Sequence, residues 1–115
     1  MNNKPDRQGD VFIRRVNEIP ADVRAGEINK DGVVAWGEVT GHMHKLSNAA
    51  RGTVFHLGEA GPVRGAQAGG KTYVEVTSPT ELVHDEHAPI NLDKGLYEIR
   101  IQREYTPEAI RNVAD

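Results

Sequence analysis

The chain has no cysteine, few aromatic residues and no long hydrophobic run. Without cysteine it offers no disulfide bond and no thiolate ligand, so a bound metal would have to be held by histidine and carboxylate groups. Aromatic residues make up only 5% of the sequence, so we expect a modest core of valine, isoleucine and leucine. No apolar stretch reaches the roughly 20 residues of a membrane-spanning helix, and the polar start lacks the apolar segment of a secretory signal. We therefore expect a cytoplasmic protein with no membrane partner.

An excess of basic residues is also missing. The chain has 14 basic and 17 acidic residues and a formal net charge of −3. This balance argues against general binding to a nucleic-acid backbone, which usually needs a clustered basic surface, so we do not expect a nucleic-acid partner. The alternative of one local basic edge rests on four arginines, which we expect to be mainly solvated strand residues: Arg14, Arg15, Arg100 and Arg103.

Short alternating segments separated by turn residues predict an all-β fold. The length of 115 residues suits one domain, with residues 1–9 as a flexible lead-in and residues 10–115 as a single β domain. The β-prone segments that carry this prediction are residues 10–16, 33–39, 53–57, 71–77, 81–84 and 95–105. Turn signals every ~8–12 residues are typical of a small antiparallel barrel or sandwich.

Two local patterns add detail to this fold. The alternation that begins at residue 33 can continue through residue 46, which would place residues 33–46 in one strand. Near the end, Thr106, Pro107 and Glu108 supply a threonine cap, a proline at the first helical position and an acidic first turn. We therefore expect a short C-terminal helix.

Four of the five histidines lie in two short clusters. The first cluster is Gly41-His42-Met43-His44 and the second is His84-Asp85-Glu86-His87. Residues two apart in a strand point to the same side of a sheet, so His42 and His44 can present two imidazoles to one ion. The fifth histidine, His56, lies in a short apolar strand, and we expect it to be a hydrogen-bonded core residue, or a residue that supports the metal ligands, rather than a ligand itself.

The second cluster allows two geometries. If the chain stays extended, His84 and Glu86 share one face of a strand. If the chain turns at Asp85 and Glu86, His84 and His87 come together instead. Both geometries remain open from the sequence.

These patterns predict a metal site whose first ligands are His42, His44 and His84. His87 is a candidate for a fourth ligand or a nearby acid or base, and Glu86 for a ligand or a base. We therefore expect Glu86 and His87 to be the catalytic residues. Zinc is the first choice of divalent ion, with iron, manganese or nickel as alternatives. Three protein ligands leave a position for water, whose pKa a bound metal lowers toward ~7.

A Gly-His-x-His motif on a strand, followed about 40 residues later by another strand histidine, resembles the cupin superfamily. The resemblance implies a small β-barrel that holds a metal, with His42 and His44 as the pair and His84 as the later histidine. The glutamate that this family carries shortly after the pair has no counterpart here, so Glu86 or Glu38 would have to replace it. The chain also resembles small uncharacterised bacterial proteins with Gln-Gly-Asp-Val near the start and Gln-Arg-Glu-Tyr near the end, which implies no activity.

The histidine pattern is compatible with three functions. The first is a metal-dependent hydrolase that uses bound water on a small-molecule substrate, because this reaction needs the least additional machinery. The second is a binding or assembly module whose histidines line an interface or hold a structural metal. The third is a cupin-like metal-dependent oxidoreductase. We also expect a homo-oligomer, because a second copy could cover an exposed sheet edge.

Overall fold

The computed structural model describes residues 6–9, 11–36, 43–58 and 71–101. These ranges form strands connected by short turns, one short α-helix and one 3-10 helix. The strands are β1 (Asp6–Gln8), β2 (Val11–Val16), β3 (Glu27–Asn29), β4 (Val33–Trp36), β5 (Met43–Leu46), β6 (Gly52–Leu57), β7 (Lys71–Val76), β8 (Thr80–His84), β9 (His87–Leu92) and β10 (Gly95–Ile101). The helices are α1 (Ala21–Arg24) and η1 (Ala49–Arg51).

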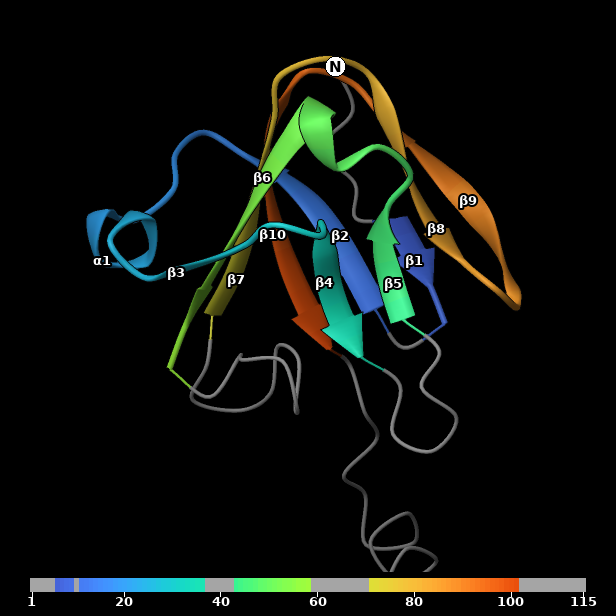
Figure 1. The fold of residues 1–115 in the computed structure, drawn as a ribbon, viewed down its shortest axis with the longest axis horizontal. Coiled ribbons are helices and arrows are strands. Elements are labelled where there is room, and N and C mark those ends of the chain that lie inside the picture. Colours follow the sequence, from blue (N-terminus) through green and yellow to red (C-terminus); the bar gives the residue numbers. More distant parts are fainter. Residues whose placement is uncertain (1–5, 10, 37–42, 59–70, 102–115) are drawn as a thin grey trace, which may run out of the picture.

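The strands form two antiparallel sheets that pack face to face (Figure 1). The six-stranded sheet has the order β1-β2-β10-β7-β6-β3, and the four-stranded sheet has the order β4-β5-β8-β9. Each sheet ends in edge strands, so the described part of the chain is an open sandwich and not a closed barrel. The all-β prediction is confirmed, and of its two architectures the sandwich is the one observed.

The alternation of apolar and polar residues explains which face of each strand is buried. In β2, Val11 and Ile13 point into the sandwich while Arg14 is exposed on the outer face. In β7, Val74 and Val76 are buried in the same way. Because aromatic residues are few, the core is built mainly from aliphatic residues: Val11, Ile13, Val34, Ala35, Leu46, Val54, Val74, Val76, Leu82, Leu92, Tyr97 and Ile99.

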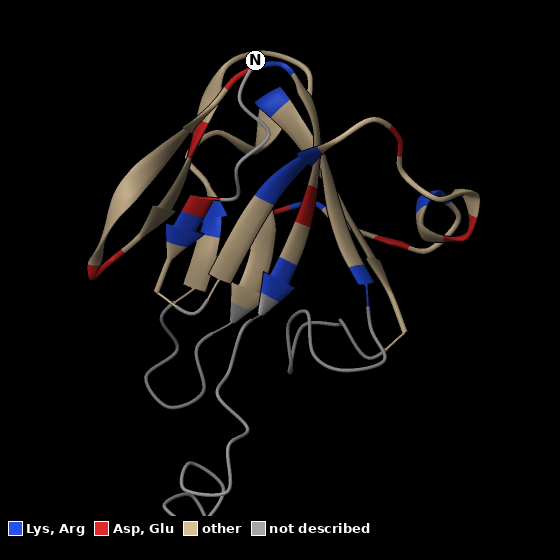
Figure 2. Ribbon diagram, turned by 180° about the vertical axis from the view of Figure 1, so that it is seen from behind, with Lys and Arg blue, Asp and Glu red and all other residues tan. Residues whose placement is uncertain are grey.

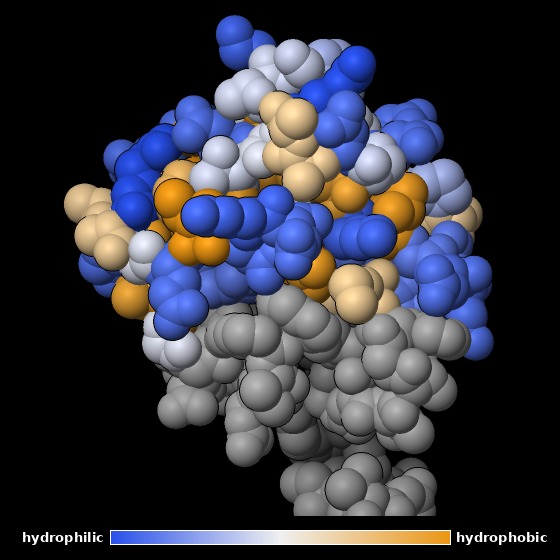
Figure 3. Space-filling model, viewed as in Figure 1, coloured by the Kyte–Doolittle hydropathy of each residue, from blue (hydrophilic) through white to orange (hydrophobic). Residues whose placement is uncertain are grey.

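A second apolar cluster lies on the outer face of the six-stranded sheet. The segment around α1 places Ile19 and Val23 against Phe55, and all three side chains are buried. The face seen in Figure 3 shows apolar residues in separate patches among hydrophilic ones. Among the described residues, the large hydrophobic side chain that stays exposed is Ile28 on edge strand β3, at 52% exposure.

The first histidine cluster does not lie on one long strand, which corrects the expected strand over residues 33–46. The chain forms two strands instead, β4 and β5, which pair antiparallel with Ala35 opposite His44. The chain therefore reverses direction between them. Pairing with β4 places His44 in the interior, where it is 5% exposed.

The structure describes the predicted lead-in only in part and does not describe the C-terminal residues. Residues 6–8, within the expected lead-in, form β1, and Gln8 is 1% exposed. The expected C-terminal helix falls in residues 102–115, which lie outside the described residues. No helix within the described ranges is long and apolar enough to cross a membrane.

Candidate functional site: a three-histidine cluster

Three histidines from separate strands gather at the side of the sandwich where β1 faces β9. His44 comes from β5, His84 from the end of β8 and His87 from the start of β9. The ring centroids of His44 and His84 are 4.2 Å apart, and those of His84 and His87 are 4.8 Å apart. His44 and His87 are 6.4 Å apart with nearly parallel rings. The cluster runs from buried His44 to exposed His87, so it opens to solvent.

The turn between β8 and β9 brings two of these histidines together. Asp85 and Glu86 form the turn, and His84 pairs directly with His87 across it. Of the two geometries that the sequence allowed, the turn is therefore the one observed. Among the described residues no non-glycine residue has a positive φ, so this is not the usual primed hairpin turn. A register shift just before His84 accompanies it.

Gln8 connects this cluster to the edge of the six-stranded sheet. Its buried amide nitrogen donates to the carbonyl oxygens of Leu82 (2.9 Å) and Ala88 (2.8 Å). Its Oε1 lies 2.9 Å from Nδ1 of His44. Because the amide nitrogen is committed to two carbonyls, Oε1 must be the acceptor and His44 must carry a proton on Nδ1. In the neutral ring of His44, the lone pair is then on Nε2.

His84 is held in the opposite tautomer. Its Nδ1 accepts a hydrogen bond from the backbone N–H of Glu86 at 3.1 Å. A neutral His84 ring therefore carries its proton on Nε2. For this ring to bind a metal, either the metal replaces the N–H of Glu86 at Nδ1, or the proton moves from Nε2 to Nδ1 and that hydrogen bond is lost.

A glycine gives His87 its place beside β1. Gly9 follows Gln8 with a φ of +62°, a conformation that glycine adopts easily. A Cβ atom at this position would lie 2.7 Å from Nε2 of His87, too close for a real contact. A side chain on residue 9 would therefore displace the His87 ring from the cluster.

The predicted ligands are only partly placed by the structure. His44 and His84 lie together as expected, and His87 joins them, while His42 lies outside the described residues. Glu86 is exposed in the turn and contributes its backbone N–H to His84. In the described ranges, no three histidine or carboxylate side chains have ligand atoms grouped as a metal ion needs.

His56 has a different role, as the sequence suggested. It is 3% exposed, and its ring bonds the hydroxyl of Thr72 at 2.9 Å and the carbonyl of Val33 at 3.1 Å. Because a carbonyl only accepts, Nε2 carries the proton and Nδ1 accepts from Thr72. Burial lowers the pKa of His56 from its usual 6.5, and the bond to Val33 and the charge of Glu27 partly offset this.

A separate concave region lies away from the histidines. It is a cleft of about 470 Å³ where η1 faces the β8 and β9 strands. Its polar lining includes Ser47, Arg51, Thr80, Glu81, Asn91 and Asp93. None of its lining residues belongs to the histidine cluster.

Sequence reasoning missed Gln8, although it is central to the site. A polar residue three positions before a strand gives no signal of burial, because the bond to Ala88 spans 80 residues of sequence. One weak signal is Gly9, since a glycine between two β-prone segments indicates a tight turn or a close backbone approach.

Comparison with known proteins adds a family but no activity. No curated protein and no solved structure gives a significant match. The match to one family covers residues 7–102, a range that includes Gln8 and the three clustered histidines. The chain therefore belongs to the family described as a domain of unknown function, DUF8820.

Proposed function

We propose that this protein binds a divalent metal ion, zinc first, through His44, His84 and His87, and hydrolyses a small-molecule substrate there. The observation that carries the proposal is the convergence of three imidazoles from three strands at a site open to solvent. His42, two residues before His44, is the candidate for a fourth ligand.

The spacing of the rings supports this proposal. Zinc–nitrogen bonds of about 2.0–2.1 Å place the centroids of two imidazoles on one tetrahedral ion about 5 Å apart. The three observed separations of 4.2, 4.8 and 6.4 Å lie on both sides of that value. All three rings would have to turn a nitrogen toward the same ion for it to be held.

The partner of His44 also supports a metal. Histidine ligands usually donate their second ring N–H to a carbonyl or carboxylate, which fixes the tautomer and raises the basicity of the ligand nitrogen. Gln8 accepts from Nδ1 of His44 in this way and directs the lone pair to Nε2. Because Gln8 is itself held by two backbone carbonyls, the His44 ring is oriented before any ion arrives.

The residues divide the chemistry between them. A divalent cation in the cluster supplies Lewis acidity and lowers the pKa of water. Buried His44 would hold the ion from the interior, and exposed His87 would hold it from the solvent side. Glu86 lies in the exposed turn beside His84, where its carboxylate is a candidate proton acceptor.

The test is metal binding followed by activity. Tag-free protein, stripped and reloaded with zinc, should bind about one ion per chain by titration calorimetry and elemental analysis. His44→Ala, His84→Ala and His87→Ala should each lose this binding while far-ultraviolet circular dichroism stays unchanged, and Asp31→Asn serves as a surface control. His42→Ala decides whether a fourth ligand exists. Wild-type protein that takes up no metal after reloading would contradict the proposal.

Hydrolysis is tested separately on the loaded protein. A panel of chromogenic ester and phosphoester substrates should show turnover that His84→Ala abolishes. Zinc binding without turnover on any substrate would support the metal site and contradict the proposed hydrolase activity.

A second candidate is a non-catalytic module in which the histidines form a polar binding surface without a metal. It is favoured by the hydrogen bond from the backbone N–H of Glu86, which already occupies Nδ1 of His84. The absence of a ready ligand group in the described ranges also favours it. Nitrogen-15 NMR distinguishes the metal site from the metal-free binding surface, because added zinc shifts the signal of a ring nitrogen only if the histidines bind the metal.

A further inference from the structure

A row of side chains crosses three neighbouring strands on the outer face of the six-stranded sheet. Phe12 in β2 is paired with Arg7 in β1 on one side and with Arg100 in β10 on the other. Residues paired in this way lie on the same face, so the side chains of Arg7 and Arg100 leave the sheet on either side of Phe12. Arg7 also lies over the ring, with Cζ 5.2 Å from its centroid. Phe12 remains partly exposed.

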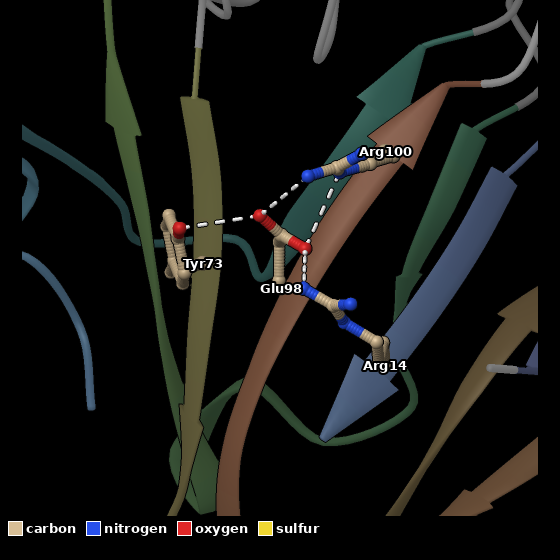
Figure 4. Close-up of polar contacts among 4 residues, drawn as sticks. All are labelled: Arg14, Tyr73, Glu98 and Arg100. Carbon is tan, nitrogen blue, oxygen red and sulfur yellow. Dashed lines mark hydrogen bonds and ion pairs between the residues drawn. The ribbon is translucent and has the colours of Figure 1, made fainter. Parts of the chain in front are cut away.

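A second row beside this one holds Arg14, Glu98 and Tyr73, and Arg100 of the first row reaches Glu98 (Figure 4). Arg14 donates to Oε1 of Glu98 at 2.9 Å, and Nε of Arg100 lies 3.3 Å from the same oxygen. Tyr73 donates its hydroxyl to Oε2 of Glu98 at 3.2 Å. Burial, and next the charge of Glu98, raise the pKa of Tyr73, which keeps its hydroxyl protonated as a donor.

These contacts hold the arginines in place without burying them. Glu98 is 14% exposed, whereas the side chains of Arg14 and Arg100 are 49% and 68% exposed. A guanidinium has five N–H donors, and one carboxylate cannot use all the donors of two arginines. The pair is therefore preorganised by Glu98 and still presents N–H groups to solvent. Viewed from behind, basic residues lie on the neighbouring strands β1, β2 and β10 (Figure 2).

We propose that this arginine face (Arg7, Phe12, Arg14 and Arg100) binds single-stranded nucleic acid. Three cations and one carboxylate make the face locally positive, although the whole chain carries a net charge of −3. The basic edge considered from the sequence is thus partly different. Arg15 points to the other side of the sheet, over the Tyr97 ring and onto the Lys94 carbonyl, and Arg103 lies outside the described residues.

The mixture of cations and an aromatic ring selects this ligand. Guanidinium groups match phosphates, and a partly exposed ring offers a base a surface for stacking. Neighbouring strands are about 4.8 Å apart, so Arg7 and Arg100 are each one strand step from Phe12, comparable with the separation of a base from its own phosphate, and Arg14 lies two residues along β2. An acidic peptide would use the arginines but would leave the ring without a stacking partner.

The test is fluorescence anisotropy with a labelled oligo(U) strand and the full chain. With three phosphate contacts, affinity should fall about 20-fold between about 50 and 200 mM salt. Arg14→Gln/Arg100→Gln should weaken binding, while Lys30→Gln/Lys94→Gln, which removes the same charge from exposed turns, should leave it unchanged. Phe12→Leu keeps an apolar side chain but removes stacking, so it should weaken binding at least ~5-fold.

Glu98→Gln gives a result of opposite sign. It removes the carboxylate from the face, so binding of oligo(U) should become tighter. Three results would overturn the proposal: no binding at the lowest salt, equal losses in the arginine and lysine double variants, or displacement by polyglutamate as effective as by unlabelled oligo(U). The proposal is independent of the metal site, because none of the variants touches a clustered histidine.

Discussion

His56 and the three-histidine cluster place the same side chain in two contrasting environments. His56 lies between the sheets, where one ring nitrogen bonds Thr72 of the neighbouring strand and the other bonds Val33 of the opposite sheet. The clustered rings lie at the margin of the sandwich, 4.2 to 6.4 Å from one another, and reach solvent at His87. His56 therefore links the two sheets, whereas the cluster is the site where we propose that a metal ion binds.

Burial alone does not distinguish the two environments. His44 is as buried as His56, at 5% against 3% exposure. The two histidines differ in the groups around the ring. Hydroxyl, carbonyl and aliphatic groups surround His56, whereas two further imidazoles lie beside His44. Histidine is the side chain that most often binds metals, so the convergence of three rings is the more informative observation.

The largest expected effect is on His56. Replacing it in His56→Ala leaves the Val33 carbonyl and the Thr72 hydroxyl without their partner and opens a cavity between the sheets. We expect the free energy of unfolding to fall by about 2–4 kcal/mol in urea denaturation. Metal binding of the folded fraction should persist. A loss below 0.5 kcal/mol, about the size of a surface substitution, would show that His56 does not help to hold the two sheets together.

Gln8→Leu should have the next largest effect, and it should lower both the stability of the fold and the affinity for zinc. The variant removes two bonds to backbone carbonyls and the acceptor for His44, so stability should fall by about 1–3 kcal/mol. Zinc affinity should fall about 10–100-fold, because His44 loses the group that orients it. Calorimetry on the folded variant measures this, and Gln8→Glu provides the comparison, since its carboxylate can still accept from Nδ1. Unchanged affinity in Gln8→Leu would show that His44 needs no such support.

Lowering the pH should reduce the stability of the folded protein through His56. The pKa of His56 is lowered in the folded protein, so below its usual 6.5 the unfolded chain takes up this proton first. Stability is therefore fully present above pH 6.5 and declines as the pH falls through the lowered pKa. The difference between wild type and His56→Gln isolates this contribution, because the clustered histidines are common to both. A difference independent of pH would contradict the assignment.

The smallest expected effect is that of His87→Ala on the metal-free protein. His87 is exposed, so the free energy of unfolding should change by no more than about 0.5 kcal/mol. The rise in Tm on adding zinc, however, should disappear in this variant, since ligand binding to the folded state is what produces it. A large loss of stability without metal would assign the cluster a structural role.

Much of the fold follows from local pattern, because a half-buried strand repeats every two residues. The segments at 10–16, 53–57, 71–77 and 95–105 each correspond to an observed strand over their described residues. The error over residues 33–46 has a physical cause: alternation looks the same in one long strand and in two strands of a hairpin. The direction of the chain between them is set by tertiary pairing.

The site was less accessible to such reasoning. His84 and His87 were recognised as a possible pair because the turn between them is local. The position of His44 beside them depends on pairing between β5 and β8, and the bond from Gln8 depends on packing of β1 against the other sheet. Contacts between residues far apart in sequence leave no periodic signal, so neither could be read from spacing.

The bond between Gln8 and Ala88 has a consequence for the order in which the protein is made. Ala88 is synthesised only after 80 further residues have been added beyond Gln8. In the growing chain, His44 is therefore present before the turn that carries His84 and His87. A partial chain that stops before this turn cannot assemble the cluster. Completion of the histidine cluster thus reports that nearly the whole sandwich has been synthesised and folded.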